Sequence, residues 1–77
     1  MQLPEKLTPQ NLEAEQSLLG ALLLDKDSII KVGDRINAED FYADKHRSIF
    51  EAMTELYRKH EPVDLLSLAN RLSEREE

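Results

Sequence analysis

The side chains of this sequence that could take part in chemistry are two histidines and several neighbouring acids. His46 and His60 are too far apart to form the metal-binding pair that one helical turn brings together. A histidine near a helix C-terminus is stabilised by the negative end of the helix dipole, which explains His60 without a ligand. Asp25 and Asp27 resemble part of a calcium loop, but the glycine and the distant glutamate of such a loop are missing. Caps and solvated turns therefore explain these residues better than a metal site does.

The sequence also lacks the residues for nucleotide hydrolysis. A phosphate-binding loop of the pattern G-x-x-x-x-G-K-[ST] cannot be assembled, because the only glycines are Gly20 and Gly33. No serine has a convincing base close to it in sequence, and a chain of 77 residues offers little room for a pocket. We therefore expect no catalytic residue, no cofactor, no metal and no enzymatic activity in this chain.

Charge and composition argue against some classes of binding partner. The net charge is −6 and the isoelectric point is about 4.8. DNA is densely negative, so an acidic surface is repelled from it, and an aromatic content of 5% is low for base stacking. The first residues lack the basic start of a secretory signal, and the longest apolar run, residues 21–24, is too short to cross a bilayer. We expect a cytoplasmic protein with neither nucleic acid nor membrane as its direct partner.

Apolar side chains recur at helical spacing, and no segment alternates at period two. The pattern predicts helices over residues 11–24, 27–32 and 44–60, one helical turn after residue 37, and a last helix over 65–75. Asn11, Asn37 and Asp64 are the expected caps, Gly33 is the expected terminator of the second helix, and Pro62 breaks the chain. The predicted fold is all-α, a small orthogonal bundle of four to five helices. Residues 1–10 are expected to form an N-terminal arm, and residues 11–77 a helical head.

The apolar stripes of these helices predict the core. Its expected members are Leu19, Leu23, Phe41, Ile49, Phe50, Met53, Leu56, Leu65, Leu68 and Leu72. Leu66 falls off the stripe of the last helix, and it forms a candidate partner interface together with Leu24 and Tyr57.

Three polar or small residues raise further questions. Gly20 lies beside the first apolar stripe, where we expect another helix to approach closely. Glu15 falls within that stripe, and we expect its carboxylate to reach solvent at the helix end. The alternative is a partly buried pair with His46 or Arg47, since a buried carboxylate needs a partner. On the longest helix, Glu55 has the spacing to pair with Lys59.

Three stretches of the sequence resemble one family. They are PQNLEAEQSLLGALLLD at residues 9–25, then EDFY at 39–42 with His46-Arg47 and IFEAM at 49–53, then EPVDL at 61–65. Their order and spacing are similar to the start of the DnaB replicative helicases. The resemblance implies a ring-shaped hexamer whose N-terminal domain forms a collar and self-associates in pairs. It also implies that this domain helps to dock a DnaG-type primase and, in some systems, a helicase loader.

The same resemblance implies that the ATP- and magnesium-dependent motor is a separate C-terminal domain. No residue of that motor can be matched here, and we expect a fragment that also lacks the helical hairpin following the head. The expected function is a non-catalytic protein-interaction module for collar assembly and for primase or loader docking in DNA replication. The alternative is a small helical domain that guides single-stranded DNA, for which the basic residues are Arg35, Lys45, Arg47, Arg58 and Lys59.

Overall fold

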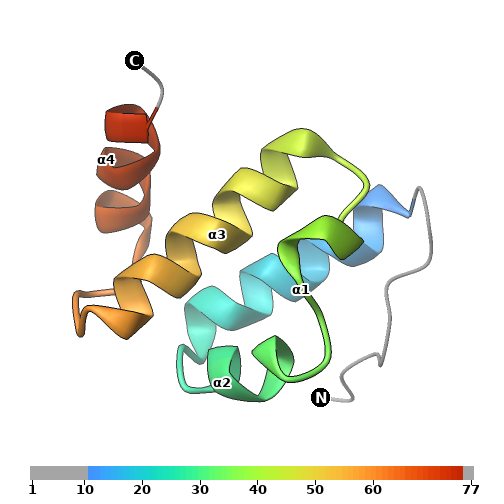
Figure 1. Cartoon of the computed structure of the whole chain (residues 1–77), viewed down its shortest axis with the longest axis horizontal. Helices are drawn as coiled ribbons and strands as arrows, with labels where there is room; N and C mark the ends of the chain where they lie inside the picture. Colours follow the sequence, from blue (N-terminus) through green and yellow to red (C-terminus); the bar gives the residue numbers. More distant parts are fainter. Residues whose placement is uncertain (1–10, 76–77) are drawn as a thin grey trace.

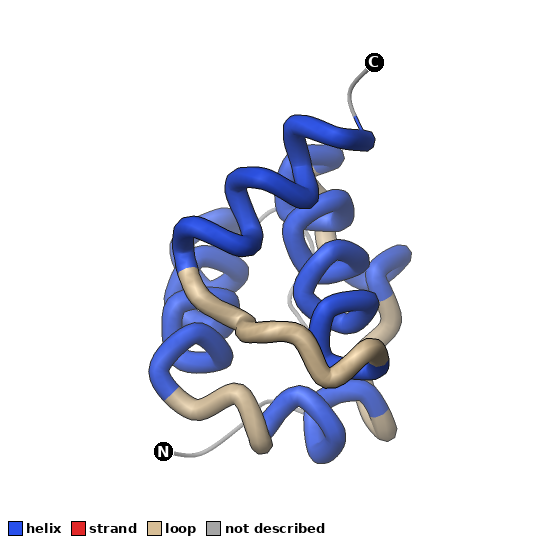
Figure 2. Tube along the Cα trace, turned by 90° about the vertical axis from the view of Figure 1, so that its left-hand side faces the viewer, coloured by secondary structure: helices blue, strands red, loops and turns tan. Residues whose placement is uncertain are grey.

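The computed structural model describes residues 11–75 as helices joined by short loops (Figure 1). In chain order they are α1 (Leu12–Leu24), α2 (Ser28–Gly33), the single 3₁₀ turn η1 (Ala38–Asp40), α3 (Asp44–Arg58) and α4 (Leu65–Arg75). Figure 2 shows that this part of the chain contains no strand. The predicted all-α bundle is therefore confirmed. The predicted arm, residues 1–10, lies outside the described residues.

Helices α1 and α3 lie side by side and form the centre of the bundle (Figure 1). The side chain of Asn11 caps α1, since its Oδ1 accepts a hydrogen bond from the backbone N–H of Ala14 at 3.0 Å. This confirms the predicted start of the first helix. α2 and η1 follow as short segments, and the connection between them delivers Ile36 and then Phe41 into the core.

The short helix α2 does not end in the way that the sequence predicts. Gly33 is the last residue of α2, but its φ is not positive, so it does not adopt the left-handed conformation of a glycine terminator. The N–H groups of Arg35 and Ile36 instead donate to the carbonyl of Val32, at 2.9 and 2.8 Å. These turn bonds satisfy the helix end without a left-handed residue. Asn37 precedes η1 as predicted, and its N–H donates to Oδ2 of Asp40 at 2.8 Å.

The left-handed residue of the fold lies at the end of α3. His60 has a φ of 60°, the N–H of Glu61 donates to the carbonyl of Leu56 at 2.9 Å, and the N–H of His60 donates to Tyr57 at 3.1 Å. This hydrogen-bond pattern is a Schellman motif with histidine in the position that glycine usually occupies. It ends α3 at Arg58, two residues before the predicted end.

Helix α4 begins as predicted, because Oδ1 of Asp64 accepts a hydrogen bond from the N–H of Ser67 at 2.8 Å. The prediction that Leu65 is a core residue is wrong, since its side chain is 73% exposed. Leu65 is the first residue of α4, and helical side chains lean towards the helix N-terminus. It therefore projects past the contact with α3, while Leu68 is buried there and Leu72 is half-buried.

The core lies between α1 and α3 and is closed on one side by α2 and η1. Its centre is a contact between the rings of Phe41 and Phe50, whose centroids are 5.2 Å apart. Among the predicted core residues, the buried ones are Leu19, Phe41, Phe50, Met53, Leu56 and Leu68, and the half-buried ones packed against them are Leu23, Ile49 and Leu72. The buried residues that the predicted core did not include are Leu18, Leu22, Ile29, Val32, Ile36, Ala52 and Val63.

The expectation of a close helix approach at Gly20 is also wrong. Gly20 is exposed, and a Cβ built on it meets no described atom within 4 Å. No neighbouring helix in residues 11–75 therefore requires glycine here.

Replacing Gly20 with alanine should raise the stability of the chain. Alanine is favoured over glycine by roughly 0.8–1 kcal/mol inside a helix, and the new methyl group has open space. Urea unfolding of Gly20→Ala should show a higher midpoint with an unchanged slope. A lower midpoint would mean that the α1 face around residue 20 is covered in solution.

Replacing Phe50 with alanine should unfold the chain. The truncation costs about 3–5 kcal/mol, which is comparable with the roughly 3–5 kcal/mol that a core of this size supplies. Thermal melting followed by circular dichroism should show loss of the cooperative transition. Leu66→Ala, which truncates an exposed side chain, is the control. An unchanged melting temperature for Phe50→Ala would contradict the placement of this ring in the core.

Candidate interaction surface and the contact that orders it

Several large apolar side chains are exposed on the described surface. Leu24, at the end of α1, is 91% exposed, and Leu66, in the first turn of α4, is 73% exposed. The sequence placed both in a candidate partner interface, and the structure leaves both accessible. The other exposed members of this group are Leu12, Ile30, Tyr42 and Leu65.

Tyr57, the third residue of the candidate interface, is half-buried. Its side chain packs against the core and also lines a surface cleft of about 550 Å³. The cleft lies between the start of α2 and the loop after α3, and its other lining residues are Lys26, Asp27, Ile30, His60, Glu61 and Pro62. Ile30 is 57% exposed at this cleft, whereas its neighbour Ile29 is buried in the core.

A second cleft, of about 510 Å³, opens between α2, η1 and α3. Ile29, Ile36 and Phe50 supply its apolar lining, and Asn37, Thr54 and Arg58 supply polar groups. Thr54 is not free to bind a ligand with its hydroxyl hydrogen, because Oγ1 donates to the carbonyl of Phe50 at 2.9 Å. Neither cleft brings together residues with a catalytic arrangement among those that the structure describes.

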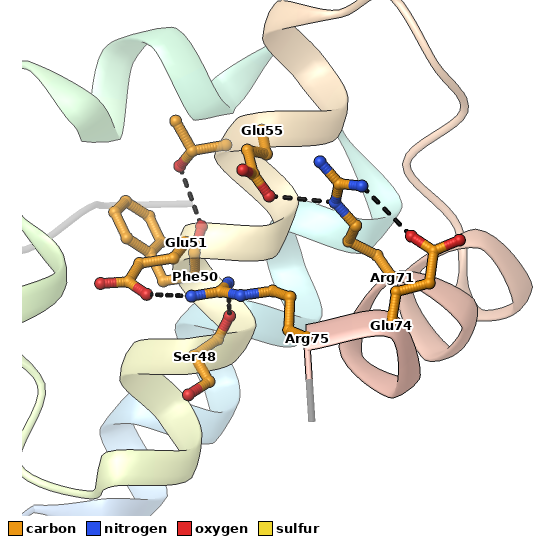
Figure 3. A network of polar contacts seen from close by, with 8 residues as sticks. Ser48, Phe50, Glu51, Glu55, Arg71, Glu74 and Arg75 are labelled. Atoms are coloured by element: carbon orange, nitrogen blue, oxygen red, sulfur yellow. Dashed lines mark hydrogen bonds and ion pairs between the residues drawn. The ribbon is translucent and has the colours of Figure 1, made fainter. Parts of the chain in front are cut away.

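Polar contacts rather than apolar ones connect the outer parts of α3 and α4 (Figure 3). Nε of Arg71 lies 3.0 Å from Oε1 of Glu55, and Nη2 of Arg75 lies 2.6 Å from Oε1 of Glu51. The hydrogen bond from Arg71 holds the pKa of Glu55 below its ordinary value and raises that of Arg71. The sequence had paired Glu55 with Lys59 on the same helix. The structure pairs it with α4 instead, which sequence spacing within one helix cannot reveal.

One polar contact of the described residues is buried between α1 and α3. Oε1 of Glu15 lies 2.6 Å from Nδ1 of His46, and both side chains are excluded from solvent. Oε2 accepts a hydrogen bond from the N–H of Tyr42 at 2.6 Å, and Oε1 accepts a longer one from Ala43 at 3.4 Å. The expectation that Glu15 reaches solvent is therefore wrong, and the buried pair with His46 is what the structure shows.

Arg47, the other partner considered for Glu15, makes different contacts. Its Nε donates to the carbonyl of Phe41 at 2.7 Å, and its Nη1 donates to Asp44 at 3.2 Å. Glu15 and Arg47 thus hold the segment 41–43 from opposite helices. Because Ala43, at the N-cap position of α3, has no side chain to accept a hydrogen bond, the carboxylate of Glu15 supplies the negative charge that the positive end of this helix favours.

Burial alone would raise the pKa of Glu15, because it disfavours the charged carboxylate. The hydrogen bonds from His46, Tyr42 and Ala43 outweigh burial, so the pKa lies below its ordinary value of 4.5. The group is therefore ionised at neutral pH. Its role is structural, since the side chain is fully buried and its carboxylate is held by His46, Tyr42 and Ala43.

Metal sites and membrane-spanning helices are both absent from the described residues. Residues 11–75 contain no group of three or more histidine, cysteine or acidic side chains placed to hold a metal ion. None of the described helices is long and apolar enough to cross a membrane.

Comparison with known proteins gives a consistent result. The family model for the DnaB-like helicase N-terminal domain matches residues 7–77. The replicative DNA helicase DnaB of Mycobacterium leprae is 43% identical over 67 residues, which cover 87% of this chain and 11% of that protein. The replicative DNA helicase DnaB of Nostoc sp. is 41% identical over 71 residues, which cover 92% of this chain and 8% of that protein. The chain thus spans about a tenth of the length of these relatives.

A solved structure matches the fold. The crystal structure of the N-terminal domain of DnaB helicase from Mycobacterium tuberculosis aligns with a TM-score of 0.82 and 43% identity. The alignment covers 87% of this chain and 49% of that one.

Replacing Glu15 with glutamine should destabilise the chain and weaken its response to acid. Losing the ionic partner of buried donors costs about 1–3 kcal/mol at pH 7. Because the folded pKa of Glu15 is lowered, its contribution is complete above the unfolded value of about 4.5 and is lost as the pH falls through the folded pKa. Urea unfolding between pH 7 and pH 3 should therefore show that the difference in free energy of unfolding between wild type and Glu15→Gln decreases below pH 4.5.

Glu13→Gln provides the matched control, since Glu13 is exposed in the same turn of α1. It makes the same chemical change without touching the buried contact. The structural role of Glu15 would be contradicted if the loss of unfolding free energy in Glu15→Gln stayed constant down to pH 3. It would also be contradicted if this loss equalled the loss in Glu13→Gln.

Proposed function

Because the chain belongs to the family of DnaB-like helicase N-terminal domains, we propose that it is a non-catalytic protein-interaction module of a replicative DNA helicase. In this proposal it contributes to assembly of a hexameric collar and to docking of a DnaG-type primase or a helicase loader. Its relatives are replicative DNA helicases, so its place is in DNA replication.

The observation that carries the proposal is the fold match over 87% of the chain at 43% identity. The described surface supports it in a second way. Leu24 and Leu66 are strongly exposed, so both side chains are accessible to a protein partner. The proposal assigns the chain no cofactor of its own and places it in the cytoplasm, at the replication fork.

Guidance of single-stranded DNA has less support. The net charge is −6, and Arg47, one of the five basic residues considered, already donates to Phe41 and Asp44. Polyanion binding would depend on the remaining four, against a surplus of acidic side chains.

The proposal predicts measurable binding between proteins. Sedimentation velocity should show concentration-dependent self-association, and titration with a DnaG-type primase should show saturable binding. Replacing both Leu24 and Leu66 with serine should weaken at least one of these by about tenfold, since truncating an energetically important residue of an interface costs more than about 1 kcal/mol. Lys31→Ser, an exposed position on α2, is the control.

If the chain alone shows no binding, the measurements are repeated with a longer protein. About half of the M. tuberculosis N-terminal domain chain has no counterpart in this chain. A chimaera would join that unmatched half to this chain. If neither the chain nor the chimaera self-associates or binds primase, the proposal fails. Salt-sensitive binding of single-stranded DNA, with no protein binding, would favour the alternative instead.

A further inference from the structure

Helix α4 is attached to the bundle through one neighbour. Within the described residues, α3 is the only helix with which α4 makes a substantial packing contact. In Figure 1, α4 stands at the edge of the bundle, at a steep angle to α3, whereas α1 and α3 lie side by side. The contact with α3 therefore provides most of the attachment of α4 to the bundle.

The apolar part of this attachment is small. Leu68 is the only buried residue of α4, and Leu72 is half-buried. The other two leucines of the helix, Leu65 and Leu66, are each 73% exposed. By contrast, α1 buries three leucines and α3 buries Phe50, Ala52, Met53 and Leu56. Few buried apolar contacts mark an element that opens at low free-energy cost.

Two ion pairs supply much of the remaining contact (Figure 3). Arg71 reaches Glu55, and Arg75 reaches Glu51 and also the carbonyl of Ser48 at 3.2 Å. The side chains of Glu55 and Glu51 are 43% and 50% exposed, so dissolved salt screens both pairs. The attachment should therefore weaken as ionic strength rises.

The connection before α4 has the features of a hinge. The Schellman motif at His60 fixes the end of α3, and Val63, in the loop, is buried in the core. Asp64, which follows, is exposed and caps α4 from its own side. The chain is thus anchored up to Val63, and α4 with its cap forms a separate unit after it.

We propose that α4 opens and closes as a unit on α3, about a hinge between Val63 and Asp64, and that the Glu51–Arg75 and Glu55–Arg71 pairs control how often it opens. Opening uncovers Leu68 and Leu72 beside the already exposed Leu65 and Leu66. The open helix then presents apolar side chains in more directions than the closed one. This device belongs to the fold of the chain and does not depend on the proposed function.

Amide hydrogen exchange of the 77-residue chain tests the proposal. Amides of α4 should exchange at least about tenfold faster than those of α3, because they exchange through a local opening and not only through global unfolding. Raising NaCl from 20 mM to 500 mM should speed exchange in α4 by about three- to tenfold relative to α3.

The variant Glu51→Gln with Glu55→Gln should produce the same acceleration at low salt, and its α4 amides should no longer respond to salt. The matched control is Glu13→Gln with Glu39→Gln, which removes the same charge from exposed positions on α1 and η1. Equal exchange rates in α4 and α3 would overturn the proposal. So would equal behaviour of the two double variants, since the ion pairs would then have no specific effect.

Discussion

The buried carboxylate of Glu15 determines how the two longest helices of the bundle meet. One side chain from α1 contacts His46 and the N–H groups of Tyr42 and Ala43, so it fixes both the start of α3 and the segment that leads into it. Phe41 lies directly before these residues and is fully buried against Phe50. The position of the central aromatic contact therefore depends on a polar one. A buried charge with three donors is stable only in one geometry, which makes this contact specify a single arrangement of α1 and α3.

The contact of Glu15 with the backbone of Tyr42 also positions a side chain on the surface. The backbone of Tyr42 is held by Glu15, while its side chain is 53% exposed. Arg47 fixes the preceding carbonyl from the other side. An aromatic side chain on such a rigid segment loses little conformational entropy when it is covered by another protein. The buried contact and the surface are thus coupled through a few backbone atoms, although no polar atom of Glu15 itself is available to a partner.

Sequence reasoning succeeded where the cause of a feature is local. Asn11 and Asp64 were identified as caps because capping needs only a side-chain oxygen three residues before an N–H. The all-α class and about half of the buried core followed from helical periodicity. The failures concern contacts between segments distant in sequence. Glu15 and His46 are joined across 31 residues, and Glu55 prefers Arg71 on another helix to Lys59 on its own. Leu65 fits the apolar period of α4, yet it lies beyond the end of the α3 contact, a boundary that periodicity does not encode.

The buried contact between α1 and α3 and the exposed ion pairs between α3 and α4 imply different mechanical roles for the helices that they join. The contact between α1 and α3 is buried, has three donors for one carboxylate, and is protected from salt. The contacts between α3 and α4 are half-exposed and are supplemented by one buried leucine. A domain that only needed a rigid core would gain more stability from apolar residues at positions 71 and 75, because exposed ion pairs contribute little. The use of arginine at both positions instead keeps α4 soluble when it separates from α3. This combination, a rigid pair of helices with one helix attached largely by ion pairs, fits the proposed role in contacts with other proteins.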